Sequence, residues 1–179
     1  MKVIHCMDVY RKDTVDCDPP PMPSNVRFGK LTEAEVLERG HLPADVHRRQ
    51  NERLIRFGAS YCYGAYIDDD LASFAWLLQP AAMRRDVPHL LTGGSGEAEL
   101  TGTETIPRHR GRWLYKYVAF GVFSAARDLS IHSVLFKMRP NGRPPKSRFA
   151  KYDARFVGRT YFAYLPGMGD PIAWPRRFA

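Results

Sequence analysis

The part of the chain best suited to hold an anion is residues 103–117, TETIPRHRGRWLYKY. Pro107 ends an expected strand there, and a long helix is expected to begin near Arg112. A helix N-terminus presents unpaired N–H groups and the positive end of the helix dipole, and Gly111 lets the backbone approach a ligand closely. Three neighbouring arginines add charge and forked donors for phosphate oxygens. These residue types fit a phosphate or pyrophosphate site, although an exposed, arginine-rich turn without a ligand has the same sequence features.

Positive charge is concentrated in the same half of the chain. The 179 residues carry a formal net charge of +8. Residues 1–95 hold 12 basic and 13 acidic residues, whereas residues 96–179 hold 15 basic and 6 acidic residues. Such asymmetry is typical of proteins that bind a polyanion, which means nucleic acid, a membrane surface or a phosphate-rich small molecule. A solvated basic face with no partner is the alternative.

Length and composition restrict the class of protein. With 44% hydrophobic and 26% charged residues the chain is not disordered, and its length fits one domain. The longest apolar run, residues 71–78, is far too short to cross a bilayer, so no membrane partner is expected. Three cysteines and six histidines show no metal-ligand spacing. We therefore expect no metal, reduced thiols and a cytoplasmic location.

The elements that would position the anion site follow from local sequence patterns. Alternating or continuous apolar runs predict strands at residues 3–11, 26–31, 60–67, 71–79, 97–106, 133–138 and 156–165. Helical spacing predicts helices at residues 32–40, 44–57, 112–127 and 144–154. Thr32 and Glu35 form a capping box at the start of the first helix. The stretch 112–127 is apolar on most sides, which predicts a well-buried helix.

The connections divide the chain without separating a second domain. Strands 60–67 and 71–79 form a hairpin around the acidic turn at residues 68–70. Proline-rich and glycine-rich stretches predict an extended connector at residues 16–25, a flexible connection at residues 80–96 and a proline-broken tail after residue 165. This order of strands and helices predicts an α/β layout with a mixed sheet.

The segment PRHRGRWLYKYVAFGVFSAARDLSIHSVLF, residues 107–136, resembles the coenzyme A-binding segment of the GNAT (Gcn5-related N-acetyltransferase) superfamily. The family pattern is Pro-x-x-Arg-Gly-x-Gly-x-Gly/Ala, followed by a long helix and a strand. Pro107, Arg110 and Gly111 match it, whereas Trp113 and Tyr115 stand where small residues are usual. The ring of Trp113 either points away and leaves its N–H available, or fills the phosphate cradle and gives a member that binds no cofactor.

The resemblance implies one GNAT-like domain over residues 1–179. Its fold would be α/β, with a mixed, mostly antiparallel sheet flanked by helices. The core would span residues 26–165, with the strand and proline-rich connector of residues 1–25 as an N-terminal addition and residues 166–179 as a tail.

The resemblance also implies that acyl-coenzyme A lies in a V-shaped gap between strands 97–106 and 133–138. Backbone groups of Thr105 and Ile106 would bind the pantetheine arm, and a strand N–H near Ile106 would donate to the thioester oxygen. Backbone N–H groups from Gly111 to Tyr115 would cradle the pyrophosphate. The residues assigned to the cofactor are Thr105, Ile106, Arg110, Gly111, Arg112, Trp113, Leu114, Tyr115, Asn141 and Ser147.

The amine acceptor must lose a proton, so the site needs a base. Glu97 stands thirteen residues before Arg110, a spacing that resembles the base of some family members, and Glu104 is closest to the cofactor loop. Strand alternation places Glu97 and Glu99 on one face and Glu104 on the other. Tyr152 is the candidate that returns a proton to the leaving thiolate. Surface carboxylates that balance local arginines, and a tyrosine packed against the sheet, are the alternative interpretations.

The expected function is therefore an N-acyltransferase that moves an acetyl or other acyl group from acyl-coenzyme A to a primary amine. The amine attacks directly, through a tetrahedral intermediate, and needs no metal and no protein nucleophile. The expected partners are acyl-coenzyme A and a small-molecule or peptide amine, with a homodimer left open. The alternatives are a catalytically silent GNAT-fold scaffold and, less favoured, a basic nucleic-acid-binding module, which rests on charge alone.

Overall fold

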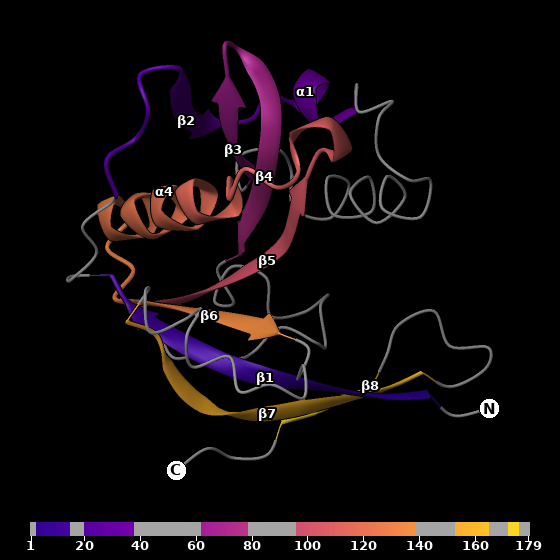
Figure 1. Ribbon diagram of the computed structural model, residues 1–179. Coiled ribbons are helices and arrows are strands. Elements are labelled where there is room, and N and C mark those ends of the chain that lie inside the picture. The colour runs from indigo at the N-terminus through magenta and orange to yellow at the C-terminus, as the bar shows by residue number, and fades with distance from the viewer. Residues whose placement is uncertain are drawn as a thin grey trace.

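The computed structural model describes residues 3–14, 20–37, 62–78, 96–138, 153–164 and 172–175. Figure 1 shows its elements. The strands are β1 (Val3–Asp13), β2 (Val26–Lys30), β3 (Cys62–Ile67), β4 (Asp70–Leu78), β5 (Glu97–Thr105), β6 (Ser133–Met138), β7 (Arg155–Tyr164) and β8 (Ile172–Pro175). The helical elements are α1 (Glu33–Leu37), the short 3₁₀ turn η2 (Pro107–His109) and α4 (Tyr115–Asp128).

All eight described strands join one sheet in the order β2-β3-β4-β5-β6-β1-β7-β8. Among these strands, only β5 and β6 pair in parallel, and the other neighbours are antiparallel. The parallel pair is joined through α4, as a strand–helix–strand unit requires. The mixed, mostly antiparallel sheet predicted from the sequence is confirmed.

The N-terminal strand lies inside the sheet. Residues Asp8–Asp13 of β1 pair with β6, and residues Val3–Arg11 pair with β7 on the other side. The strand predicted at residues 3–11 is thus present, and it connects the β2–β6 part of the sheet with β7 and β8. The tail after residue 165 was expected to have no regular structure. That expectation is wrong for residues 172–175, because β8 pairs antiparallel with β7.

The predicted hairpin forms from β3 and β4. Asp68 and Asp69 adopt positive φ angles of 48° and 65°. Two such residues make the turn whose twist suits a tight hairpin, and Asp tolerates this conformation better than most side chains. The predicted capping box also forms, since the Thr32 N–H donates to the Glu35 carboxylate at 2.7 Å and the Glu35 N–H donates to the Thr32 hydroxyl at 3.2 Å. The expected helix at residues 44–57, the connection at residues 80–95 and residues 144–152 of the helix expected at 144–154 lie outside the described residues, and the last two residues of that helix, Asp153 and Ala154, are described and are not helical.

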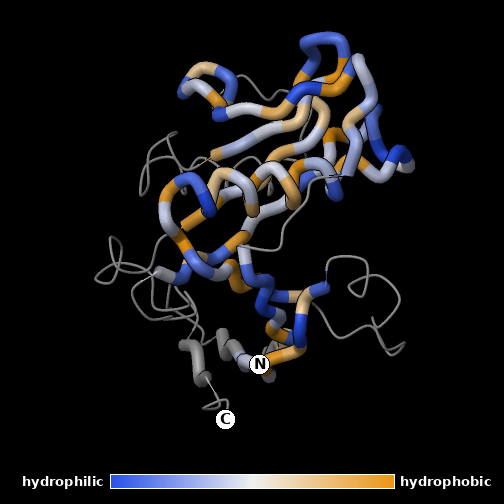
Figure 2. The backbone as a smooth tube through the Cα atoms, turned by 90° about the vertical axis from the view of Figure 1, so that its left-hand side faces the viewer, coloured by the Kyte–Doolittle hydropathy of each residue, from blue (hydrophilic) through white to orange (hydrophobic). Residues whose placement is uncertain are grey.

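Helix α4 packs its apolar side on β2–β6 and forms the main core. Val118, Val122 and Phe123 are buried against strand residues such as Leu77 and Val134. In Figure 2, hydrophobic and hydrophilic residues alternate along this helix, which matches one buried and one exposed side. The contact is tight, because a Cβ atom at position 121 would lie 2.3 Å from the Phe28 ring, so only glycine fits there.

Candidate functional site

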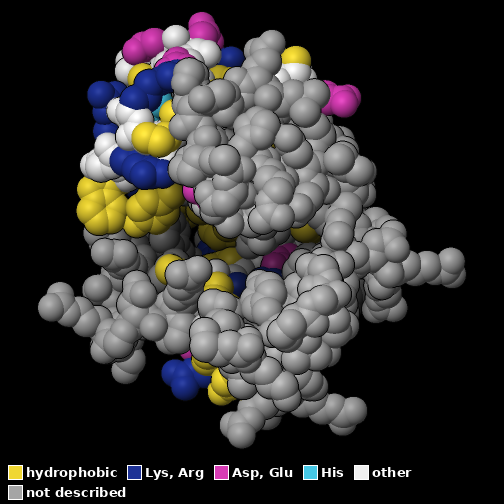
Figure 3. Space-filling view, turned by 90° about the vertical axis from the view of Figure 1, so that its right-hand side faces the viewer, with side chains coloured by type: hydrophobic (Ala, Val, Ile, Leu, Met, Phe, Trp, Pro, Cys, Tyr) yellow, Lys and Arg dark blue, Asp and Glu magenta, His cyan; other side chains and the backbone are white. Residues whose placement is uncertain are grey.

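The two parallel strands pair over only part of their length. Glu97–Leu100 of β5 pair with Ser133–Phe136 of β6. Beyond Leu100, β5 continues to pair with β4 up to Thr105, whereas β6 continues to pair with β1 up to Met138. The strands therefore part in the plane of the sheet, as Figure 1 shows. In Figure 3, hydrophobic, basic and acidic side chains of described residues are visible inside a hollow on this side of the molecule.

A β-bulge lies on β5 directly after the point of parting. Gly102 and Thr103 together lie opposite the single residue Ala75, because Thr101 pairs with Trp76 and Glu104 pairs with Phe74. Gly102 has a φ of 60°, which favours glycine. The bulge reverses the alternation of side chains along the strand.

This reversal overturns one prediction about the candidate bases. Phe74 and Trp76 share a face of β4, so their partners Glu104 and Thr101 share a face of β5. Glu104 therefore lies on the same face as Glu97 and Glu99, opposite to α4. Simple alternation placed it on the other face because the extra residue in the bulge cannot be seen in the sequence pattern.

The end of β5 fixes which backbone groups face the opening. The Ile106 N–H donates to the Ala72 carbonyl at 2.9 Å, so this N–H is already used, and the predicted strand N–H near Ile106 has to come from a neighbouring residue. Successive backbone groups of a strand point to alternate sides, so the N–H and carbonyl of Thr105 face away from β4. The Thr105 carbonyl accepts a hydrogen bond from Arg110 Nε at 3.2 Å on that side. Thr105, rather than Ile106, supplies the strand N–H nearest the turn.

The turn after β5 is tied to the β3–β4 hairpin. The Asp70 carboxylate accepts hydrogen bonds from the Arg108 guanidinium, with Nε at 3.0 Å, and pairs with His109 Nε2 at 2.7 Å. The hydrogen bond from Arg108, followed by that from His109, holds the pKa of Asp70 below its usual value despite some loss of solvation. Arg108 is therefore a structural residue of the turn, and two of the three neighbouring arginines remain as candidates for a ligand.

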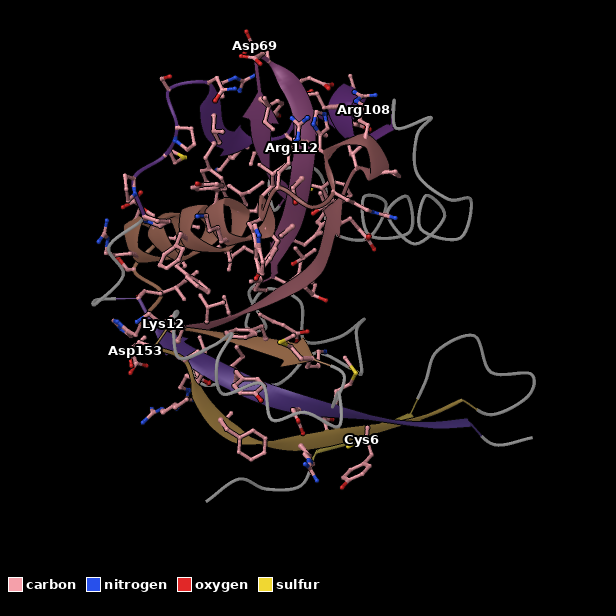
Figure 4. All side chains as sticks on the ribbon, in the orientation of Figure 1. Cys6, Lys12, Asp69, Arg108, Arg112 and Asp153 are labelled. Carbon is pink, nitrogen blue, oxygen red and sulfur yellow. The ribbon has the colours of Figure 1, made fainter. Side chains whose placement is uncertain are left out.

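Four consecutive N–H groups at the start of α4 have no acceptor among the described residues. Within the described part of the chain, no acceptor is found for the N–H groups of Gly111, Arg112, Trp113 and Leu114. Gly111 has a φ of 81°, and a Cβ atom there would meet nothing within 4 Å. Arg110 and Arg112 are exposed beside these groups, and Figure 4 shows Arg108 and Arg112 on this part of the chain. The arrangement provides donors and positive charge around open space, which is what an anion site requires.

Trp113 takes a conformation that the sequence did not predict. Its φ is 59°, so the helix begins at Tyr115 instead of near residue 112. The Trp113 side chain is exposed, with a relative accessibility of 59%, and its ring centroid lies 5.9 Å from that of Tyr115. This geometry supports the alternative in which the indole ring points away and the Trp113 N–H stays available. Tyr115, the fifth expected cradle residue, forms the first turn of the helix.

The candidate acidic residues differ in their surroundings. Glu97 lies where β5 and β6 are still paired, and its carboxylate accepts hydrogen bonds from the Arg11 guanidinium and, at 3.1 Å, from the Ser133 hydroxyl. Glu104 lies beyond the bulge and is half-buried. Glu99 is completely buried, and its Oε1 lies 2.5 Å from Lys137 Nζ.

Glu99 is the residue that sequence reasoning underrated. The sequence analysis placed Glu99 on the candidate strand but did not select it as a site residue. The sequence alone does not show that Lys137, the single cation of SVLFKM, reaches Glu99 across the sheet. Tyr152, Asn141 and Ser147 lie outside the described residues.

The described residues hold neither a cluster of metal-ligating side chains nor a membrane-spanning helix. No group of three or more His, Cys, Asp and Glu side chains gathers in the described ranges as a metal site would require. No helix in the part of the chain that the structure describes has the length and apolarity to cross a membrane.

Comparison with known proteins supports the fold and not a sequence family. No family model matches the chain, and no curated protein matches it in sequence. Among solved structures, a GCN5-related glucosamine N-acetyltransferase region of a fungal multi-domain GH3 β-N-acetylglucosaminidase is similar, with a TM-score of 0.70 at 8% identity. The similarity covers 92% of this chain and 21% of that one.

Two solved structures of shorter proteins are also similar to this chain. A tandem GNAT protein from the clavulanic acid biosynthesis pathway gives a TM-score of 0.60 at 17% identity, covering 93% of this chain and 55% of that one. A GCN5-related N-acetyltransferase from Kribbella flavida gives 0.55 at 12% identity, covering 93% and 61%. The chain thus spans less than two thirds of each of these proteins. At such identities the shared property is the fold, so this chain has the fold of these GNAT acetyltransferase structures.

Proposed function

We propose that the chain is an N-acyltransferase that moves an acetyl or other acyl group from acyl-coenzyme A to a primary amine. One observation carries this proposal: four adjacent N–H groups without a described acceptor, at residues 111–114, follow directly on the strand that parts from its parallel neighbour. A diphosphate needs several convergent donors, and an extended arm attached to it needs a strand edge with unused backbone groups. The GNAT fold of the similar proteins supports the same function.

The residues on this side of the fold fit coenzyme A. The N–H groups from Gly111 to Leu114 would hold the pyrophosphate, with Tyr115 completing the first helical turn and Arg110 and Arg112 adding charge. The N–H of Thr105 would bind the pantetheine arm. Asn141 and Ser147, which the resemblance assigns to the cofactor, are proposed as further contacts. When bound, acyl-coenzyme A supplies an activated thioester carbonyl, and the chain supplies donors, orientation and a base.

The reaction is a direct transfer. The amine nitrogen forms a bond to the thioester carbon, the carbon–sulfur bond breaks, and the thiolate takes a proton, for which Tyr152 is the proposed donor. Glu97 and Glu104 are the proposed bases, acting through water. Glu97 lies where β5 and β6 are still paired, whereas Glu104 lies beyond the bulge, beside the opening, and this position favours Glu104.

The experiment that tests the cofactor is thermal unfolding with and without acetyl-coenzyme A, with 3′,5′-ADP as a second ligand. Ligand at 100 times its dissociation constant stabilises by about 2.7 kcal/mol, which for this length raises Tm by roughly 5–11 °C. A flat response to both ligands would contradict the proposal and favour the silent scaffold. A response to 3′,5′-ADP alone would indicate a nucleotide site without acyl transfer.

A pair of variants locates the site. Gly111→Ala and Gly111→Glu carry the same backbone cost at φ 81°, and neither Cβ meets a neighbour. Only the glutamate adds negative charge beside the N–H groups. We expect Gly111→Glu to lose at least about tenfold more affinity for coenzyme A than Gly111→Ala, since close like charges cost more than 1.4 kcal/mol. Equal affinities in calorimetric titration would show that the cofactor binds elsewhere.

A further inference from the structure

The point where β5 and β6 part is closed by an ion pair. The parallel ladder ends at the pair formed by Leu100 and Phe136. Lys137 is the next residue of β6, and its Nζ lies 2.5 Å from Oε1 of Glu99 on β5. The side chains of Glu99 and Lys137 are 1% and 11% exposed. The ion pair thus crosses the last backbone pair diagonally, from Glu99, one residue before it on β5, to Lys137, one residue beyond it on β6.

The two faces of the sheet are both filled at this point. On the α4 side, Leu100 and Phe136 are buried with Phe123 in the main core. Side chains of neighbouring residues point to opposite faces, so Glu99 and Lys137 lie on the side away from α4. A group that reaches the junction from the opening therefore meets packed hydrocarbon on one face and the ion pair on the other.

The direction of β5 places the acyl end of the donor at this junction. The strand leads from Leu100 to Thr105 and then into the N–H groups at residues 111–114. A diphosphate held there directs its arm back along β5. Five residues of strand cover about 17 Å, which an extended phosphopantetheine arm can follow. The acyl group then lies next to Leu100, and a longer acyl chain continues into the Glu99–Lys137 pair.

We propose that the Glu99–Lys137 pair is a polar stop that restricts the acyl donor to short chains such as acetyl. This inference rests on the proposed function. A long aliphatic chain has to separate the two charges in a buried place without offering them polar partners, which is unfavourable. An acetyl group ends before the pair and leaves it intact.

The first test measures the affinities of the unmodified protein for coenzyme A and for its acetyl, butanoyl and octanoyl thioesters by calorimetric titration. An apolar pocket would bind longer chains more tightly, because each buried methylene adds affinity. We expect acetyl-coenzyme A to bind about as tightly as coenzyme A, and octanoyl-coenzyme A at least about tenfold more weakly. Octanoyl-coenzyme A that binds as tightly as acetyl-coenzyme A would overturn the inference while leaving the proposed function intact. No binding of coenzyme A itself would overturn both.

The second test replaces both charges by apolar side chains of similar size, in Glu99→Leu with Lys137→Met. Replacing a whole buried pair in this way is usually tolerated. We expect the ratio of octanoyl to acetyl affinity to rise at least about tenfold, with the affinity for coenzyme A unchanged. An unchanged ratio in a folded double variant, checked by circular dichroism, would overturn the inference.

The matched control removes the neighbouring ion pair of Arg11 and Glu97, in Arg11→Met with Glu97→Gln. This pair starts from the same strand and the same face, two residues before Glu99 and further from the opening. We expect it to leave the ratio unchanged. An equal rise in both double variants would show a general loosening of the sheet and would also overturn the inference.

Discussion

The two ends of β5 differ in what surrounds them. At residues 97–100 the strand has a neighbour on each side, a partly buried ion pair to Arg11, a buried one to Lys137, and the core formed with α4 on one face. At residues 102–106 it has β4 on one side, a bulge, and then a turn whose N–H groups face no described acceptor. One strand therefore combines a part that holds the sheet together with a part that offers backbone groups to a ligand.

This difference predicts that substitutions in the closed part reduce stability, whereas substitutions in the open part affect binding. The largest expected effect is Glu99→Leu alone, which leaves Lys137 buried without its carboxylate. Breaking a buried pair in this way costs about 3–5 kcal/mol, or a fall in Tm of roughly 6–20 °C. Urea denaturation of this variant and of the Glu99→Leu, Lys137→Met double variant would check it. Equal losses in the two variants would mean that stability depends on the Glu99–Lys137 pair itself, and not on the charge that remains on Lys137.

A smaller effect is expected where α4 meets the sheet. Gly121→Ala places a methyl group 2.3 Å from the Phe28 ring, which stacks on Tyr63. Overpacking of this kind costs about 1–3 kcal/mol, although alanine is the better helix former. In a Phe28→Leu background the ring is gone, so the same change should be neutral or stabilising. A similar loss in both backgrounds, measured by chemical denaturation, would contradict the contact.

The hydrogen bonds of Asp70 join the turn after β5 to the β3–β4 hairpin, and their contribution to stability depends on pH. The pKa of Asp70 is lowered in the folded state, mainly by the hydrogen bond from Arg108, so its bonds stabilise the fold above the ordinary value of 3.8. This contribution disappears as the pH falls through the lower folded pKa. Asp70 is partly exposed, so we expect Asp70→Asn to cost less than about 1 kcal/mol at pH 7.

Stability curves of the Asp70→Asn variant and the unmodified protein should then converge as the pH falls below 3.8. A difference between the two that stays constant with pH would show that the hydrogen bonds, and not the charge, fix the turn.

The smallest expected effect is at Trp113. A bulky residue at φ 59° is strained by about 1 kcal/mol or more, and glycine removes that strain. The loss of the ring contact with Tyr115 offsets part of this gain, so we expect Trp113→Gly to stabilise by about 0.5 kcal/mol. Trp113→Phe keeps the strain and is the control. A destabilised glycine variant would show that the indole ring contributes more than its exposure indicates.

Local sequence signals predict most of the structure outside the open end of β5 and the turn that follows it. The hairpin, the capping box and the buried strands β5 and β6 follow from turn residues and apolar spacing, which depend only on neighbouring residues. The GNAT fold follows from the pattern around Pro107, Arg110 and Gly111 together with the order of elements.

The open part depends on geometry that residue spacing does not encode. The bulge at Gly102 moved Glu104 to another face, and the positive φ of Trp113 delayed the helix to Tyr115. The hydrogen bond from Ile106 to Ala72 and the reach of Lys137 to Glu99 are contacts between distant segments. Such contacts come from tertiary packing, and no pattern in either segment alone predicts them.

The place of β1 has a consequence for how the chain folds as it is made. Its partner strand β6 begins 120 residues after β1 ends, and β7 follows still later. At ribosomal rates of about 5–20 residues per second, β1 waits on the order of ten seconds before its first neighbour exists. During that time its edges are unpaired, and pairing across so long a separation is slow. The half of the sheet built on β1 is therefore the last to assemble and the part most dependent on protection by a chaperone.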